Sequence, residues 1–168
     1  GDWISQIDLA ISPDGPMVAY CKKTSDSITT VIIRDIESGT NRQDITFGMQ
    51  PACSVTAFND DGSQVAVSLA HISAFEEVPA GESRWSLRLI STATDETESI
   101  LQDTDDFMPE FNLFGEDIPL LALVHQFDAE SITFAGAPVV GMGGPPNLPV
   151  YQWDIAGNTV EELPIEFG

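Results

Sequence analysis

Three carboxylates lie within four residues at Asp103, Asp105 and Asp106, a grouping that could bind a metal ion. Calcium takes about six to eight oxygen ligands and is often bound by acidic residues gathered in a loop. An EF-hand loop starting at Asp103 would need Gly at its sixth position and Glu at its twelfth, where this sequence has Met108 and Phe114. The three aspartates are therefore candidates for calcium outside that pattern, and the alternative is a solvated turn.

The two histidines, His71 and His125, carry imidazoles that suit metal binding or general-base catalysis. Each follows a short apolar stretch, 65–67 and 121–123, that we expect to be the second strand of a repeating unit. Alternation along a strand allows both side chains to lie on the same side of the fold. The sequence contains no His-x-His or His-Glu-x-x-His spacing and no Gly-x-Ser-x-Gly motif. We therefore assign no catalytic residue and no cofactor, and expect both histidines to be structural or exposed.

A glycine-rich run at 141–147 invites comparison with phosphate-binding loops. It lacks the Lys-Ser/Thr pair that completes such a loop, and its prolines exclude the helix whose N-terminus would bind the phosphate. We interpret it as a loop between strands, and residues 74–83 as a second one. Surface loops often carry contacts, and Trp and Arg are enriched at binding hot spots, so Arg84 and Trp85 beside the second loop are predicted interaction residues.

Charge excludes several classes of partner. The 168 residues hold 27 Asp and Glu against 6 Lys and Arg, a formal net charge of −21. Such an excess repels nucleic-acid phosphates and anionic lipids, so we expect neither nucleic acid nor a membrane surface as a partner. The apolar runs end well before the ~18 residues of a membrane span, so no membrane insertion is expected. A hydrophobic fraction of 42% is enough for the core of one domain, residues 1–168.

Cysteine usage and the N-terminus bear on location. Cys21 and Cys53 allow one possible pair, far from a disulfide framework, and we expect two buried free thiols. No basic stretch precedes an apolar one at the start of the sequence, as a signal peptide would require. A sequence that begins with Gly does not thereby exclude export, and the acidic surface favours an extracellular or periplasmic setting without establishing it.

An internal repeat organises the chain. Residues 9–20 read as an alternating strand, a tight turn at Asp14-Gly15 and a second strand. The pattern recurs 47 residues later at 56–67, with Asp61-Gly62 in the turn, and a degraded copy follows after a further 56 residues at 112–123. The third copy has Asp117-Ile118 at the turn, so we expect that turn to differ.

Two further strands follow each hairpin. A strand that ends in a polar turn recurs at 31–39, 87–95 and 150–157, and a last polar-flanked strand recurs at 42–47, 97–101 and 159–165. No window has the 3.6-residue period of a helix. The sequence therefore predicts an all-β protein of three units, each with four short antiparallel strands.

These units resemble the repeats of TolB-like and WD40-like β-propellers. The resemblance rests on Ser12-Pro13-Asp14-Gly15, on the turn 34–39, and on Trp153-Asp154, which resembles the dipeptide that closes the third strand of a WD40 repeat. The Gly-His pair usual in WD40 repeats is missing, which favours the TolB-like style. A repeat-wide position serves the repeat, so Trp153 and Asp35 are expected to pack blades and anchor turns.

The resemblance implies three blades, at about 1–48, 49–107 and 108–168. A closed propeller needs at least about four blades, so the ring is incomplete and two sheet faces lack a neighbour. We expect those faces to be covered by a second copy, by a partner protein or by further blades of a longer chain.

Two functions follow from this expectation. The first is a non-catalytic module for protein–protein interaction or assembly, with loops 74–83 and 141–149 on one rim and Arg84 and Trp85 in contact with the partner. Trp85 has an equally weighted alternative position in the core between blades. The second function is the propeller segment of a hydrolase or peptidase, similar to prolyl-oligopeptidase-type enzymes, whose catalytic domain lies outside these residues.

Overall fold

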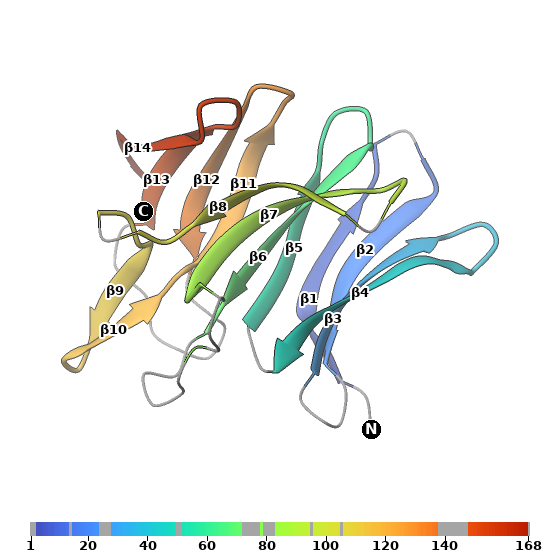
Figure 1. The fold of residues 1–168 in the computed structure, drawn as a ribbon, viewed down its shortest axis with the longest axis horizontal. Helices are drawn as coiled ribbons and strands as arrows, with labels where there is room; N and C mark the ends of the chain where they lie inside the picture. Colours follow the sequence, from blue (N-terminus) through green and yellow to red (C-terminus); the bar gives the residue numbers. More distant parts are fainter. Residues whose placement is uncertain are drawn as a thin grey trace.

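A computed structural model describes residues 3–13, 15–23, 28–49, 52–71, 78, 83–94, 96–104, 106–137 and 148–167. The described residues form fourteen β-strands and no helix. Twelve of the strands make three four-stranded antiparallel sheets, and the other two make a separate hairpin. Figure 1 shows the three sheets side by side, fanned around part of a ring, which confirms the predicted all-β architecture of four-stranded blades in an incomplete ring.

Each sheet takes its strands in chain order, so every connection within a sheet joins neighbouring strands. Blade 1 contains β1 (Trp3–Ile11), β2 (Met17–Lys23), β3 (Ile28–Asp35) and β4 (Asn41–Met49). Blade 2 contains β5 (Ala52–Phe58), β6 (Gln64–Ala70), β7 (Trp85–Ser91) and β8 (Thr97–Gln102). Blade 3 contains β11 (Leu121–Phe127), β12 (Ser131–Ala137), β13 (Leu148–Asp154) and β14 (Thr159–Phe167).

The turn between the first two strands is built the same way in all three blades. A polar side chain at the end of the first strand accepts a hydrogen bond from the backbone N–H that starts the second. Ser12 Oγ accepts from Met17 at 3.1 Å, Asn59 Oδ1 accepts from Gln64 at 2.9 Å, and Asp128 Oδ1 accepts from Ser131 at 2.9 Å. These bonds satisfy turn donors that the strand ladder leaves unpaired, and they define equivalent positions across the repeat.

The turn after the third strand is also repeated. Asp35 Oδ1 accepts hydrogen bonds from the backbone N–H and the hydroxyl of Ser38, which lower the pKa of Asp35, and Asp154 Oδ1 accepts from the Gly157 N–H at 2.8 Å. In blade 2 the hydroxyl of Ser91 takes the same place. The expected turn-anchoring role of Asp35 is therefore confirmed.

The third copy of the hairpin lies elsewhere than the sequence predicted. Residues 112–123 do not form the first hairpin of blade 3, because β9 (Glu110–Leu113) and β10 (Glu116–Pro119) pair with each other as a separate sheet. Phe114 and Gly115 form the two-residue loop with φ of 53° and 90°, the pattern of a type I′ hairpin turn. Blade 3 begins at β11, so this hairpin is an insertion between blades 2 and 3.

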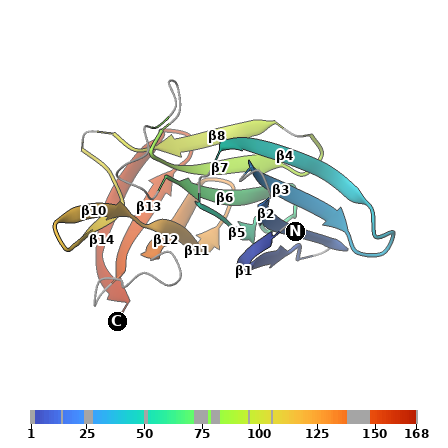
Figure 2. The ribbon, with the colours of Figure 1, turned by 90° about the horizontal axis from the view of Figure 1, so that it is seen from below.

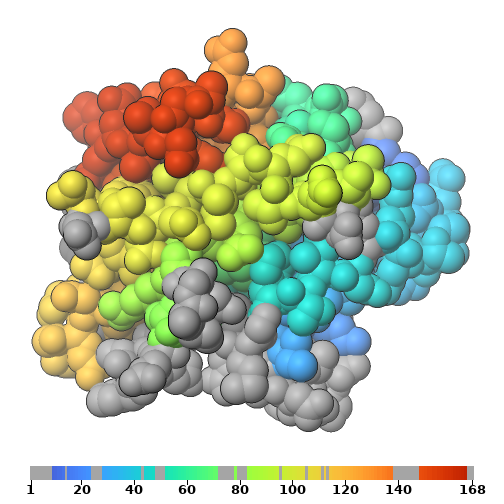
Figure 3. All heavy atoms as spheres, viewed as in Figure 1, coloured from blue at the N-terminus to red at the C-terminus, as the bar shows by residue number. Residues whose placement is uncertain are grey.

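Blade 2 is the central sheet. Its innermost strand β5 lies against β1 of blade 1 on one side and β11 of blade 3 on the other. Figures 2 and 3 show blades 1 and 3 at opposite ends of the molecule with blade 2 between them. Two cores result, one between blades 1 and 2 and one between blades 2 and 3.

The second core is rich in aromatic side chains. The Trp85 ring stacks on Phe134 with centroids 6.0 Å apart, and Phe107 meets the edges or faces of both Trp85 and Tyr151 at 5.6 and 5.3 Å. Trp153 is fully buried in the same core, as the interpretation as a blade-packing residue requires. Burial raises the pKa of Tyr151 to about 12, and the nearby carboxylates of Glu162 and Glu110 add to the rise.

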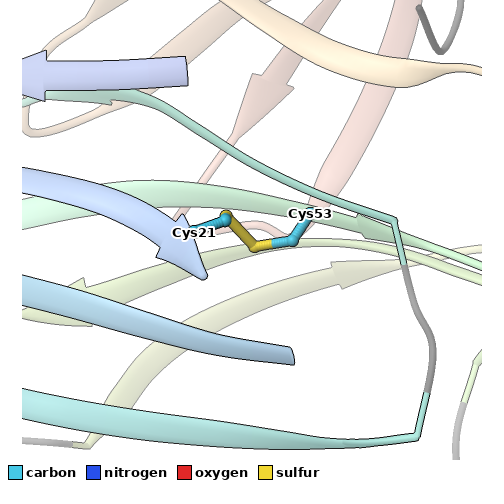
Figure 4. The surroundings of a disulfide bond; sticks show 2 residues. All are labelled: Cys21 and Cys53. Carbon is cyan, nitrogen blue, oxygen red and sulfur yellow. A yellow bond between two sulfur atoms is a disulfide. The ribbon is translucent and has the colours of Figure 1, made fainter. Parts of the chain in front are cut away.

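The prediction of two free thiols is wrong. Cys21 on β2 and Cys53 on β5 form a disulfide across the core between blades 1 and 2, with Cα atoms 6.0 Å apart (Figure 4). Both side chains are buried. The sequence could not show this pairing, because the two residues are 32 positions apart and only the packing of one blade on the next brings them together.

Candidate interaction site

Blade 1 lies at one end of the row of sheets, and within the described residues no sheet packs against the face that it turns away from blade 2. Side chains alternate along its strands, so those outside the core with blade 2 lie on this opposite surface. Strand pairing arranges them in two rows, which we call the open face: Ile11, Val18 and Arg34 in one row, and Leu9, Tyr20, Ile32 and Asp44 in the other. Leu9, Ile11, Arg34 and Asp44 are exposed, whereas Ile32 is buried.

In blade 2 the equivalent positions are covered by a neighbouring sheet, so the exposed fractions of their side chains can be compared with those on the open face. Ile11 pairs with Val18 as Phe58 pairs with Val65, yet Ile11 is 63% exposed and Phe58 is 8% exposed. In the next row, Leu9 is 54% exposed. Its counterpart Val55, which pairs with Val67 as Leu9 pairs with Tyr20, is 2% exposed. The open face therefore has the residue types of an inter-blade surface without the blade.

Two cations border this apolar surface. Arg34 pairs with Val18 at the position that Ile90 holds opposite Val65 in blade 2, and it is exposed. Lys22 follows Tyr20 by two residues on the same face of β2. Two of the six basic residues of the chain thus lie on or beside the open face.

At the other end of the molecule, blade 3 turns a more polar surface outwards, which we call the far face. Its pairing rows hold mostly hydroxyl, amide and carboxylate groups: Gln126, Thr133, Gln152 and Glu161 in one, and Ser131, Asp154 and Thr159 in the next. Several of these residues line a hollow of about 540 Å³ together with Glu130. A third row is apolar, and in it Leu123 is 44% exposed whereas Ala135 and Val150 are fully buried.

The two loops predicted to bind a partner join equivalent strands. Residues 71–84 connect β6 to β7 and residues 138–147 connect β12 to β13, so both leave their sheets at the same end, where the β9–β10 hairpin also lies (Figure 1). Most of 74–83 and all of 141–147 fall outside the described residues. The prediction that these loops bind a partner stays a prediction.

Arg84 and Trp85 do not form an exposed pair. Trp85 is fully buried, and its indole Nε1–H donates to the Leu120 carbonyl at 2.7 Å, so its side chain has the core position that was the alternative. Arg84 Nη2 donates to the Asp117 carbonyl at 2.7 Å and so holds the β9–β10 hairpin against blade 2. Burial and the neighbouring Asp117 raise the pKa of Glu110, and the Arg84 charge opposes that rise.

The two histidines occupy different positions in their blades. His71 is buried directly after β6, whereas His125 is exposed within β11, the first strand of its blade. The expectation that both follow second strands is therefore wrong, and it failed because the third repeat was assigned to the wrong segment. Within the described part of the chain, no three His, Cys, Asp or Glu side chains converge as metal ligands.

Of the three aspartates proposed as calcium ligands, the structure describes two. Asp103 Oδ1 accepts a hydrogen bond from the Trp85 backbone N–H at 3.0 Å, which ties the end of β8 to the start of β7. Asp106 is exposed, and Asp105 lies outside the described residues. The geometry gives Asp103 a structural role, and calcium binding stays untested.

Sequence reasoning did not find the open face as a set of residues, although the signal was present. Leu9, Ile11, Val18 and Tyr20 alternate along the first hairpin just as the buried residues of the second hairpin do. Alternation alone does not tell which face of a sheet is covered, because that depends on the blade packed against it. Among the described residues there is no helix, and hence none able to cross a membrane.

Comparisons with known proteins support the architecture. No family model and no curated protein matches the sequence. Among solved structures, an acylaminoacyl peptidase in complex with Z-Gly-Gly-Phe-chloromethyl ketone matches with a TM-score of 0.55 and 13% identity over 96% of this chain. The Pyrococcus horikoshii acylaminoacyl peptidase matches with a TM-score of 0.54 and 15% identity over 94%.

A third match is the β-propeller domain of the Trilobed protease from Pyrococcus furiosus, with a TM-score of 0.43 and 14% identity, covering 92% of this chain and 55% of that one. The chain spans about a quarter of each acylaminoacyl peptidase, 25% and 24%. The three packed four-stranded sheets, together with the fold likeness to the two acylaminoacyl peptidases, support a β-propeller-like fold.

Proposed function

We propose that this chain is a non-catalytic propeller module that assembles with another β-sheet through the open face of blade 1. The observation that carries the proposal is the contrast between Ile11, 63% exposed, and its counterpart Phe58, 8% exposed beneath blade 1. Soluble proteins seldom leave a contiguous apolar sheet face in water, and a propeller ring continues by adding a sheet to such a face.

The style of blade belongs to the same proposal. Trp153-Asp154 ends the third strand of blade 3, and the Asp154 side chain anchors the following turn. Both features support a TolB-like or WD40-like repeat, a scaffold on which loops and sheet faces make protein contacts. The buried Cys21–Cys53 disulfide supports an extracellular or periplasmic setting, because disulfides persist in oxidising compartments.

The experiment measures the absolute mass of the chain by light scattering, in about 0.5 M NaCl to screen its negative charge. We expect a mass above the 18.1 kDa of one chain, and a fall to 18.1 kDa in Ile11→Asp with an unchanged melting temperature. Phe114→Asp is the matched control, since Phe114 is 99% exposed on the inserted hairpin and its change adds the same charge. A wild-type chain that stays at 18.1 kDa would overturn the proposal.

A second candidate is the propeller segment of a hydrolase or peptidase whose catalytic domain lies outside these residues. Its support is the fold likeness to two acylaminoacyl peptidases, each of which is about four times as long as the part aligned. A hydrolase domain encoded next to this chain in its reading frame would favour this candidate. Esterase, peptidase or glycosidase activity in the isolated chain would contradict both candidates, because each places catalysis elsewhere.

A further inference from the structure

We propose, building on the proposed function, that the sheet which covers the open face is blade 3 of a second copy, through its far face. Two copies arranged head to tail would each present one open face and one far face. Both pairs of faces would then meet, and the six sheets would close a ring. No end sheet would remain uncovered, which is the condition that a soluble propeller has to satisfy.

The two interfaces between blades inside the chain are formed by the surfaces that are equivalent to the far face and the open face. Blade 1 meets blade 2 through Ala19 and Ile33 on its own side and Val65 and Ile90 on the other. By strand pairing, Ala19 and Ile33 correspond to Thr133 and Gln152 of the far face. The open and far faces are thus the next surfaces in an interface series that the chain forms twice, with β1 on β5 and β5 on β11.

At three positions the two outer faces carry polar residues where blade 2 has apolar ones, and these positions would face each other in a head-to-tail pair of copies. On the open face, Arg34 replaces the Ile90 of blade 2. On the far face, Gln152 replaces Leu89 and Thr133 replaces Ala66, the residues of blade 2 that turn towards blade 3. In the internal interfaces these positions pack on one another, so head-to-tail docking places the Arg34 guanidinium among the polar groups of the far face.

Charge is complementary at the same place. Lys22, Arg34 and the carboxylate of Asp44, which pairs with Ile32, border the open face and leave it with one excess positive charge, whereas the far face carries Glu130, Asp154 and Glu161. Residues 108–168 contain no Lys or Arg at all. Contact between two open faces would instead bring the cations of one copy near those of the other, which disfavours that arrangement.

The innermost strands supply apolar contact between the copies. Leu9 on β1 is 54% exposed and Leu123 on β11 is 44% exposed, and both strands lie at the inner edge of an end sheet. Innermost strands of adjacent blades lie side by side inside the chain, so in the ring β1 of one copy lies beside β11 of the other. Leu123 is therefore the residue to substitute on the far face, as Ile11 is on the open face.

The experiment uses three single variants, each adding one negative charge: Ile11→Asp on the open face, Leu123→Asp on the far face and Phe114→Asp as the control. In about 0.5 M NaCl, light scattering should give twice 18.1 kDa for the wild type and for the control. Ile11→Asp and Leu123→Asp should each give 18.1 kDa. An equimolar mixture of these two should recover the double mass, because one unaltered open face and one unaltered far face remain.

A charge exchange tests the same interface without touching apolar residues. Arg34→Glu and Glu161→Arg should each weaken association about tenfold, and mixing the two variants should restore most of it. Both positions are exposed, so the variants should melt at the wild-type temperature.

The outcomes separate the two proposals. If the wild type is a dimer that Ile11→Asp dissociates and Leu123→Asp leaves intact, the open face binds something other than the far face, and only the present inference fails. A wild-type mass of 18.1 kDa overturns both proposals, and a series of masses beyond twice that value overturns ring closure.

Discussion

The disulfide between Cys21 and Cys53 joins two blades rather than two strands of one sheet. It crosses the core that contains Ala19 and Val67, so it holds blade 1 on blade 2 from within. A cross-link limits the conformations of the unfolded chain, and the effect grows with the length of the loop that it closes.

We expect a Cys21→Ala/Cys53→Ala double variant to lose about 3–4 kcal/mol of unfolding free energy, from the loop-closure entropy of the enclosed segment. Urea unfolding of both proteins measures the loss, and full reduction of the wild type serves as the control because it breaks the same bond. The disulfide would be absent from the native protein if reduction left the urea midpoint unchanged.

Tyr151 reports on the aromatic core between blades 2 and 3. The folded pKa of about 12 lies above the ordinary value of 10.0, so folding favours the neutral phenol. The stability contributed by this shift is complete below pH 10 and is lost as the pH rises from 10 towards about 12.

We expect a Tyr20→Phe variant, in which Tyr151 is the remaining tyrosine, to titrate at about 12 when folded, in absorbance at 295 nm. The same variant in denaturant is the control and should titrate near 10. Equal values in the two states would contradict the burial of this phenol.

At the scale of the element, the hairpin turns determine the register of each blade. Gly62 has a φ of 71°, in the left-handed region, and its carbonyl accepts a hydrogen bond from the Thr92 hydroxyl at 2.8 Å. Gly157 lies in a turn of blade 3, has no such φ, and a Cβ there would meet its neighbours at ordinary contact distances of 3.5 Å or more.

We expect Gly62→Ala to lower the unfolding free energy by about 1–2 kcal/mol, because an L-residue is strained at that φ. Gly157→Ala is the matched control and should be neutral or raise it by up to about 1 kcal/mol, through a less flexible unfolded chain. Thermal or urea unfolding measures both. Equal effects of the two substitutions would contradict the turn geometry of blade 2.

The first two repeats could be predicted from sequence because Asp14-Gly15 and Asp61-Gly62 mark their turns and the flanking strands alternate. The third repeat could not, because Phe114-Gly115 makes a separate hairpin whereas the true turn, at Asp128, lacks glycine. The error misplaced His125. Trp85 was undecided for a related reason, since its environment depends on Leu120, which follows the inserted hairpin, and on Phe134 of blade 3.

At the scale of the molecule, a net charge of −21 makes the chain repel itself. Mobile ions screen this repulsion, with a Debye length of about 30 Å at 0.01 M and about 3 Å at 1 M salt. Compact folding and association of two copies both bring these charges together, so both should strengthen as salt is added.

We expect the melting temperature to rise by about 5 °C between low salt and about 0.5 M NaCl, which corresponds to roughly 2 kcal/mol for a chain of this size. The Leu123→Asp variant, expected to be monomeric, separates folding from assembly and should show most of the same rise. A melting temperature that falls with salt would mean that specific ion pairs outweigh the net repulsion.

The central claim is that the open face of blade 1 is an assembly surface, and residue-resolved carbene footprinting tests it most directly. Phe58 should be protected and Phe114 labelled in both the wild type and Leu123→Asp, as internal controls. The account predicts that Ile11 is protected in the wild type and labelled in Leu123→Asp. Equal, strong labelling of Ile11 in both proteins would contradict it.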